Sequence, residues 1–520
     1  MNVICLLSDT FRRDHLTFYN TFKHEFKLPN LQRFAEMSII FDNAYIGSYP
    51  CMPARQDLWT GRLNFLRRGW SPLEYKEQDL INRLKEHGKK TMLVTDHYHL
   101  WQAGAGNYHY SFDGMEFIRG QENDNWITDT DVEIRWPASK EKLSRNWEKY
   151  ARNTAHFSKE EDYFTPKVFQ RSIDWLENNQ SLEDFFLMID LFDPHEPFDP
   201  PEPYNRMFNP DYTGEEIIWP SYGKADRYTK EEVKHIHALY KGHLALIDKW
   251  FGKMLDKLEA LGRMEDTVFI MTSDHGFLFG EHNWVGKHSQ TLYNHITHTP
   301  IIIYHPKAES HRVNDLVQMA DLHPTILDAL DVPIPEDIHG RSLLPAVLDH
   351  STEIVEKDSI IYGVFGGAIY LTDGDWVFVK RPEKSGPLYW YTDTFYQVWD
   401  FGQNINIKET KERFQSYDHG RFEVNTMNQE TLKDGVARSA KKTMERYQMK
   451  TEHELAFKLL HDELYHITSD YEQNHNLIDK YPEKVEFFKL KLVENLRKYN
   501  APEEQYDRMG LKDHMNKFNV

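Results

Sequence analysis

Short apolar runs alternate with amphipathic segments over the first two-thirds of the chain, and this alternation constrains the fold more than any other feature. The runs that we expect to form strands cover residues 3–7, 39–44, 90–95, 185–190, 267–273 and 300–304. A long helix is expected at residues 235–261, because apolar residues recur at helical spacing from Leu239 to Leu258 and Gly262 follows. Strands that alternate with helices indicate an α/β layered domain.

Several of these expected strands have an aspartate at or just beyond their carboxyl end. The four positions are Asp9, Asp96, Asp193 and Asp274. In open α/β sheets, ligands gather at the carboxyl ends of the strands. The sequence therefore places acidic side chains where one site could collect them.

The pattern of apolar and polar residues changes after about residue 350. Residues 360–364, 368–372 and 376–380 are expected to be short strands, with a hairpin turn at residues 373–375, and residues 483–498 are expected to be a helix near the end of the chain. We therefore predict two domains. Residues 1–355 would be the α/β domain, and residues 356–520 a smaller C-terminal α+β domain.

Charge and composition limit the partners of the chain. Its 520 residues carry a formal net charge of −20, which argues against nucleic acid as a partner, because phosphate neutralisation needs clustered Lys and Arg. No apolar stretch approaches the length that spans a bilayer, so no membrane association is expected. The first apolar run lacks a basic leader and ends at Ser8-Asp9, which predicts a cytoplasmic protein. The chain has 2 cysteines, Cys5 and Cys51, so a disulfide framework is excluded as the source of stability.

The surroundings of Cys51 are the most specific motif in the chain. Residues 51–62 read CMPARQDLWTGR, which contains the pattern C-x-P-x-R-x-x-x-x-T-G. Residues 48–50 are expected to be extended or turn-like, and Pro53 suits a first helical turn, so Cys51 would lie at or beside a helix N-terminus. Free N–H groups and the helix dipole favour an anion there. Arg55 follows on the same helical face.

A formylglycine-generating enzyme oxidises this pattern in type I sulfatases, and the chain therefore resembles that family and the alkaline-phosphatase-like superfamily. The resemblance implies a large mixed sheet flanked by helices. It also implies that Cys51 becomes an aldehyde whose hydrate is a gem-diol, of which one oxygen attacks the substrate and the other later expels the product. The maturation enzyme would then be a partner, and Arg55 would hold a diol oxygen. Weaker similarity follows in the family's order, at residues 2–16, 246–276, 286–289, 463–465 and 476–477.

The resemblance also implies one divalent metal ion. Asp9, Asp274 and His275 would hold it together with an oxygen of the modified Cys51. Many family members have two adjacent acids at the first position, whereas here Thr10 follows Asp9. Calcium is the family's usual ion, and Mg²⁺, Mn²⁺ or Zn²⁺ are also compatible with such ligands.

Three further residues match catalytic positions of the family. Lys287 would contact the sulfate ester and its leaving oxygen, and His195 would protonate the leaving alcohol, because imidazole titrates near neutral pH. A histidine that holds the diol is expected at His99 or His97, with His99 preferred. The lysine that usually accompanies it has no equivalent here.

The function implied is hydrolysis of a sulfate monoester, with a sulfated saccharide preferred over a small aryl sulfate as substrate. The alternative within the superfamily is a phosphonate monoester or phosphodiester hydrolase. A non-catalytic binding protein would show a broken nucleophile motif or a vacant metal site. For the alcohol half of the substrate, Trp70, Trp101 and Trp126 are candidates for stacking, although core packing is the commoner role of tryptophan, and residues 118–122 are candidates for polar contacts.

Overall fold

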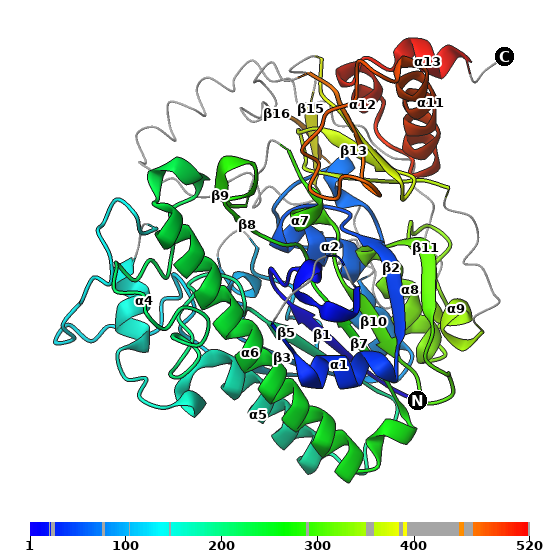
Figure 1. Cartoon of the computed structure of the whole chain (residues 1–520). Helices are drawn as coiled ribbons and strands as arrows, with labels where there is room; N and C mark the ends of the chain where they lie inside the picture. The colour runs from blue at the N-terminus through cyan, green and yellow to red at the C-terminus, as the bar shows by residue number, and fades with distance from the viewer. Residues whose placement is uncertain are drawn as a thin grey trace.

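The computed structural model (Figure 1) describes residues 1–19, 21, 26–74, 79–102, 105–144, 147–287, 291–349, 358–383, 388–392, 447–451 and 461–517. Its strands are β1 Asn2–Ser8, β2 Ile39–Tyr45, β3 Lys90–Thr95, β4 Gly114–Phe117, β5 Phe185–Leu191, β6 Gly223–Lys224, β7 Thr267–Thr272, β8 Leu278–Phe279, β9 Trp284–Gly286, β10 Ile301–Tyr304, β11 Arg312–Gln318, β12 Ile360–Gly363, β13 Ile369–Thr372, β14 Trp376–Lys380, β15 Leu388–Thr392, β16 Tyr447–Thr451 and β17 Glu463–His466. Its α-helices are α1 Pro29–Glu36, α2 Cys51–Thr60, α3 Leu80–Glu86, α4 Trp147–Thr154, α5 Phe164–Asn178, α6 Lys230–Ala260, α7 Asn294–Thr297, α8 Met319–Ala329, α9 Leu344–Leu348, α11 Pro482–Lys498, α12 Glu503–Arg508 and α13 Lys512–Lys517. A short 3-10 helix, η4, covers Tyr98–Leu100.

The centre of the molecule is an 8-stranded sheet with the order β11-β2-β10-β7-β1-β5-β3-β4. Strand β10 runs antiparallel to β2 and β7, whereas the other neighbouring pairs are parallel, so the sheet is mixed as predicted. All six strands expected from the sequence belong to it, and their observed ends differ by at most 1 residue from the expected ones. The sequence reasoning missed β4 and β11, which form the two edges and carry fewer apolar residues.

Each face of this sheet is covered by helices (Figure 1). Along β1, Ile4 and Leu6 pack in a cluster with residues of α1, α5 and α6, whereas Val3, Cys5 and Leu7 pack in a second cluster with residues of α2, α3 and α8. Successive side chains of a strand point to opposite faces, so an all-apolar strand is what a sheet buried on both sides requires. The predicted α/β layering is therefore confirmed.

The long helix α6 begins earlier than expected, at Lys230 rather than at residue 235. The Oγ1 atom of Thr229 accepts from the backbone N–H of Glu232, and the Glu232 carboxylate accepts from the backbone N–H of Thr229. This capping box fixes the first turn, although the residues there are mostly charged. The helix ends at Ala260, and Gly262 follows with φ 69°.

A second sheet, of 4 strands in the order β12-β13-β14-β17, is separate from the large one. The turn expected at residues 373–375 joins β13 to the antiparallel β14, with Gly374 at φ 93°. The expected terminal helix is α11, which two shorter helices, α12 and α13, follow. Side chains of α11 share a hydrophobic cluster with Phe65 and Leu66, so the second sheet and its helices pack against the N-terminal part of the chain. The proposed domain boundary at residue 355 lies outside the described residues.

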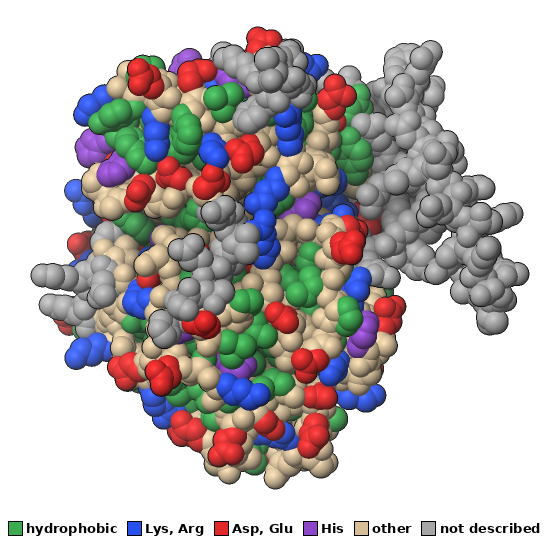
Figure 2. Space-filling model, turned by 90° about the vertical axis from the view of Figure 1, so that its right-hand side faces the viewer, with side chains coloured by type: hydrophobic (Ala, Val, Ile, Leu, Met, Phe, Trp, Pro, Cys, Tyr) green, Lys and Arg blue, Asp and Glu red, His purple; other side chains and the backbone are tan. Residues whose placement is uncertain are grey.

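On the surface, acidic and basic side chains are interspersed over the face shown in Figure 2. Among the residues that the structure describes, no helix combines the length and the apolar character that crossing a membrane requires.

Candidate active site

Cys51 is the first residue of α2, with Pro50 as the preceding cap residue, so the predicted position at a helix N-terminus is confirmed. The helix lies in the interior, and Cys51 is only 2% exposed. Burial, with the nearby charge of Asp9, raises the pKa of the Cys51 thiol well above its usual range. The thiol is therefore protonated and weakly nucleophilic at neutral pH.

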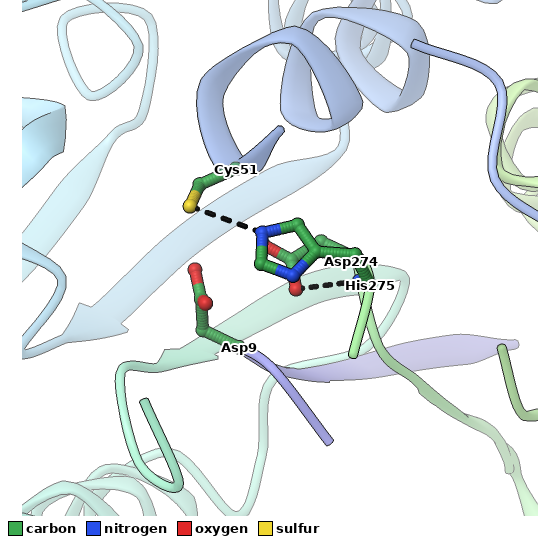
Figure 3. Close-up of side chains that lie close together, drawn as sticks. All are labelled: Asp9, Cys51, Asp274 and His275. Carbon is green, nitrogen blue, oxygen red and sulfur yellow. Dashed lines mark hydrogen bonds and ion pairs between the residues drawn. The ribbon is translucent and has the colours of Figure 1, made fainter. Parts of the chain in front are cut away.

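Asp9, Asp274 and His275 surround the Cys51 side chain (Figure 3). Asp9 follows β1 and Asp274 follows β7, and these two strands are parallel neighbours, so their carboxyl ends meet at the same edge of the sheet. One potential ligand atom from each of the four residues lies within 4.8 Å of the others. The sequence-predicted metal residues are thus brought together by the fold.

His275 is oriented as a metal-ligating histidine usually is. Its Nδ1–H donates to the carbonyl oxygen of Gly276 at 3.0 Å, which leaves the lone pair of Nε2 facing Cys51 Sγ at 3.2 Å (Figure 3). A backbone acceptor on the far ring nitrogen fixes the tautomer that binds a cation.

The two carboxylates of this cluster repel one another. Burial and the charge of Asp9 raise the pKa of Asp274 well above its usual range. Burial also opposes ionisation of Asp9, but the basic side chains around it outweigh burial and hold the pKa of Asp9 well below its usual range; they are His195, Arg55, His97 and Lys287. A cation between the two groups would relieve this repulsion. The residues present therefore fit a divalent metal ion.

Arg55 is fully buried and binds three carboxylates. Its Nη1 donates to Asp9 at 3.1 Å and to Asp274 at 2.7 Å, and its Nε and Nη2 donate to the two oxygens of Asp190 at 2.8 and 2.6 Å. It also donates to the backbone carbonyl of Cys51 at 3.1 Å. The guanidinium group thus orients the acidic groups of the cluster.

Asp190 was not recognised from the sequence as a site residue. It lies within β5, next to β1, and the apolar run that contains it was used only to predict the strand. An acid inside an otherwise apolar buried strand was the available signal, because such a group needs a buried partner.

Two of the four strand-end aspartates lie outside the metal cluster. Asp96 accepts from the backbone N–H of Phe192 and from Gln121. Asp193 accepts from Thr165 at 2.5 Å. These two groups organise the loops that follow β3 and β5.

His97 and His99 take different places. His97 Nε2 lies 3.0 Å from Asp9 Oδ2, whereas His99 Nε2 faces Glu122 Oε2 at 3.8 Å. The choice of His99 as the residue that holds the diol stays a prediction, and His97 is the one of the two that touches the metal cluster. Thr10, where many family members have an acid, donates its Oγ1–H to Asp9 at 2.7 Å and its backbone N–H to Asp274 at 2.9 Å.

Lys287 and His195 lie on another side of Cys51. Lys287 Nζ donates to Cys51 Sγ at 3.3 Å and also to His195 Nε2. His195 Nδ1 lies 2.6 Å from the carbonyl oxygen of Glu196, to which it donates. Lys287 therefore reaches the nucleophile position, and His195 reaches Lys287. Of the matched segment 286–289, residues 288 and 289 lie outside the described residues.

The candidates for substrate contacts separate in the structure. Glu122, from segment 118–122, reaches His195 and His99. Trp70 meets the ring of His99 edge-on at 5.0 Å between centroids. Trp101 packs on Phe117, and Trp126 is 38% exposed beside His156, so neither touches the residues around Cys51 in the contacts seen here.

Comparison with known proteins agrees with this site. The profile of the sulfatase family matches residues 1–332. The chain belongs to the sulfatase family. That match includes Cys51 and all of its neighbours described above.

Curated sulfatases are similar over the same part of the chain. An arylsulfatase of Clostridium perfringens is 26% identical over 388 residues, which are 66% of this chain and 77% of that protein. Arylsulfatase K of Bos taurus is 25% identical over 393 residues, which are 66% of this chain and 65% of that protein. The match thus spans just under two thirds of the bovine relative's length.

Solved structures share the fold over nearly the whole chain. A phosphonate monoester hydrolase of Agrobacterium radiobacter is 21% identical, with a TM-score of 0.63 and 96% of each chain covered. A protein solved with its substrate D-glucosamine-2-N,6-O-disulfate is 17% identical, with a TM-score of 0.62 and 96% of each chain covered. At these identities the likeness shows the alkaline-phosphatase-like fold alone.

Proposed function

We propose that this protein is a sulfuric ester hydrolase that cleaves a sulfate monoester to an alcohol and sulfate. The observation that carries the proposal is the convergence of Asp9, Asp274, His275 and Lys287 on the side chain of Cys51. Transfer of an anionic sulfuryl group needs metal ligands and positive charge close to the nucleophile. The two acids and the imidazole supply the ligands, and the ammonium group supplies positive charge.

Asp9, Asp274 and His275, with the side chain of residue 51, would hold one divalent metal ion. This ion would polarise the ester and stabilise negative charge at residue 51. Calcium is the family-based prediction for its identity. The His275 nitrogen makes the donor set softer than the all-oxygen sets that Ca²⁺ usually takes, so Mn²⁺ or Zn²⁺ fits these residues better. Metal analysis of protein purified without added metal, followed by reconstitution with each ion, decides between them.

Residue 51 would act as formylglycine rather than as cysteine. The sequence pattern around it motivates this proposal, and the raised pKa of the buried thiol supports it, because an unmodified Cys51 is a poor nucleophile. The hydrated aldehyde would supply one hydroxyl for attack and a second for product release. A formylglycine-generating enzyme would be the required maturation partner.

Lys287 and His195 would act on the departing alcohol. The ammonium group of Lys287 lies 3.3 Å from Cys51 Sγ, where it would balance the charge of a bound sulfate ester. His195 lies directly behind it, with Nε2 on the side of Lys287. These two side chains are therefore the groups able to move a proton to the leaving oxygen.

A carbohydrate sulfate is the proposed substrate class. A relative from Bacteroides thetaiotaomicron named N-acetylglucosamine-6-O-sulfatase is 24% identical over 422 residues and supports it. The glucosamine disulfate complex of a fold neighbour supports it as well.

The division at residue 355 and a cytoplasmic location stay proposals that rest on the sequence.

The alternative is a phosphonate monoester or phosphodiester hydrolase. Two such hydrolases of known structure share this fold, and their substrates have a charge and shape similar to those of sulfate monoesters. One experiment separates the readings. Protein matured with a formylglycine-generating enzyme is assayed on sulfated saccharides, aryl sulfates, phosphodiesters and phosphonate monoesters. A higher kcat/KM for every phosphorus ester than for any sulfate would reject the sulfatase proposal.

A further inference from the structure

Glu122 is a buried acid beside the catalytic residues to which no role has yet been given. It follows β4, and its side chain is 10% exposed. Its Oε1 lies 3.6 Å from Nδ1 of His195, and its Oε2 lies 3.8 Å from Nε2 of His99. Its backbone has φ 40°, a conformation that residues other than glycine adopt only at a cost.

Three oxygen atoms surround Nδ1 of His195. The Glu196 carbonyl oxygen lies at 2.6 Å, Glu196 Oε2 at 3.4 Å and Glu122 Oε1 at 3.6 Å. The short contact to a carbonyl, which only accepts, assigns the proton to Nδ1. Nε2 therefore carries the lone pair and accepts from Lys287.

This arrangement creates a difficulty for the proton donor. Burial and the charge of Lys287 lower the pKa of His195 well below its usual range, so the resting imidazole is neutral. A neutral ring with its lone pair on Nε2 accepts a proton and has none to give there. Donation to the leaving oxygen needs the imidazolium form, which in a buried site needs a negative charge close by.

We propose that Glu122 is a positioning residue for the reaction: its carboxylate beside Nδ1 supplies the charge that lets His195 exist as imidazolium and deliver a proton from Nε2 to the leaving oxygen. The inference rests on the proposed hydrolase function. Glu196 is adjacent to His195 in the chain and anchors the ring mainly through its carbonyl group. Glu122 comes from a different part of the sheet, so its approach to the same ring nitrogen is a feature of the tertiary fold.

The proton balance follows from these contacts. Burial and the neighbouring Glu196 raise the pKa of Glu122 to about 8, so in the resting site Glu122 holds a proton and His195 does not. A bound sulfate ester places negative charge against Lys287, which favours the alternative in which Glu122 is ionised and His195 is charged. The net charge of the pair is the same in both arrangements, and solvent carries the proton between them.

In the chemical step, a hydroxyl oxygen of the matured residue 51 forms a new bond to sulfur and releases its proton to solvent, as the bond between sulfur and the alcohol oxygen breaks. The electron pair of the broken bond stays on the alcohol oxygen, which takes the Nε2 proton of His195. Nδ1 keeps its own proton throughout. His195 ends neutral, and Glu122 takes a proton from solvent, which restores the resting site before the next turnover.

A second metal ion is the competing use of this cluster, because ligand atoms of His99, Glu122 and His195 lie within 4.8 Å of one another. Both ring nitrogens of His195 are already engaged, however, one with the Glu196 carbonyl group and the other with the Lys287 ammonium. A cation there would also lie close to that ammonium. The contacts therefore favour proton transfer over metal binding.

The charged and titratable groups that face His195 come from several elements. Those from the strand ends and loops around the ring are Asp9, His99, Glu122, Glu196 and Lys287, and Tyr222 donates to Glu196 behind them. Glu122→Gln changes only one of these charges and keeps the shape of the side chain.

The experiment compares matured wild-type protein with the Glu122→Gln and Glu122→Asp variants, with exposed Glu133→Gln as the matched control. Substrates are sulfate esters of graded leaving-group acidity. For Glu122→Gln we expect kcat to fall about 100-fold for poor leaving groups, in line with general-acid contributions of about 10²–10⁴-fold. We expect a loss below about threefold for activated aryl sulfates. The limb on which activity falls with rising pH should move to lower pH, and Glu122→Asp should recover part of the loss.

Two further readouts keep this proposal separate from the proposed function. NMR titration of ¹³C-labelled histidine is run with saturating inorganic sulfate, the reaction product, so that an anion lies against Lys287 and Glu122 is ionised. With the His195 signal assigned from His195→Gln, it should show a lower His195 pKa in Glu122→Gln whatever ester the enzyme prefers. If phosphorus esters are the better substrates, the same leaving-group series is run with them. Equal losses across leaving groups, or an unchanged His195 pKa, would overturn the role of Glu122. The metal content of both proteins is measured as well. If the wild type holds two metal ions per chain and Glu122→Gln holds one, Glu122 is a metal ligand instead.

Discussion

Asp190→Asn tests whether the buried ion pair between Asp190 and Arg55 stabilises the fold and the metal site. Asp190 and Arg55 are both 0% exposed, and they share two hydrogen bonds of 2.8 and 2.6 Å. A charge-assisted hydrogen bond contributes about 1.5–3 kcal/mol, and removal of one partner from a buried ion pair costs about 3–5 kcal/mol. Because Asp9 and Asp274 remain to compensate Arg55, we expect the lower end, about 3 kcal/mol of unfolding free energy.

The same substitution should weaken metal binding. Arg55 would be free to turn further toward Asp9 and Asp274, and it would compete with the cation for their oxygens. Residues that orient metal ligands typically change affinity by about 10–100-fold, and we expect a rise in the metal Kd within that range. Metal titration of the stripped protein by calorimetry measures it, and urea denaturation measures the stability change.

Asp256→Asn is the matched control. Arg33 and Asp256 form a hydrogen bond of 2.8 Å, but their side chains are 39% and 65% exposed. Exposed ion pairs contribute about 0–1 kcal/mol, so this variant should unfold almost as the wild type does. Equal urea midpoints for the two variants would refute the argument, because it derives the larger cost entirely from burial.

Three other outcomes are expected. Mass spectrometry of active protein should find formylglycine at residue 51, and full activity with an unmodified Cys51 would contradict this. Asp9→Ala and Asp274→Ala should each lose most of the bound metal and most of the activity, and a double variant that keeps stoichiometric metal would disprove the assignment. Chelation should lower the melting temperature of the wild type, because a ligand that binds only the folded state stabilises it. The pKa of Glu122 is raised from 4.5 to about 8, so the folded state favours the protonated form. Its contribution to the free energy of unfolding is complete below about pH 4.5 and is lost as the pH rises through about 8. Glu122→Gln should therefore lose less stability than the wild type between about pH 5 and 8 in urea denaturation, and parallel curves would exclude a raised pKa.

The strands of the large sheet were predictable because they are buried on both faces. Their sequences are nearly all apolar, as in residues 3–7, and such runs identify a central strand without further information. The edge strands β4 and β11 lack this signal, since one side of an edge has no partner strand. The start of α6 lacked an apolar signal too, but Thr229 and Glu232 have the spacing of a capping box.

The metal residues were predictable for a different reason. Asp9 and Asp274 lie within two residues of the ends of β1 and β7, and the edge at which they meet follows from the parallel arrangement of these strands. Asp190 and Glu122 could not be placed in the same way. Asp190 acts from inside a strand, and Glu122 reaches His195 from a loop in which Glu122 itself has a positive φ. The choice between His97 and His99 depends on ring orientations at the start of η4, where His97 is the preceding cap residue and His99 lies within the helix, and the sequence alone does not give these orientations.

The charge at the centre of the site explains why a divalent ion fits this chain. Arg55 binds Asp9, Asp190 and Asp274, so three carboxylates share a single guanidinium group. All four side chains are at most 1% exposed, and water therefore cannot screen the two negative charges that remain when all three carboxylates are ionised. An ion of charge +2 balances them. A second acid in place of Thr10 would leave the group negative even with such an ion bound, whereas the Thr10 hydroxyl orients Asp9 through a hydrogen bond and adds no charge.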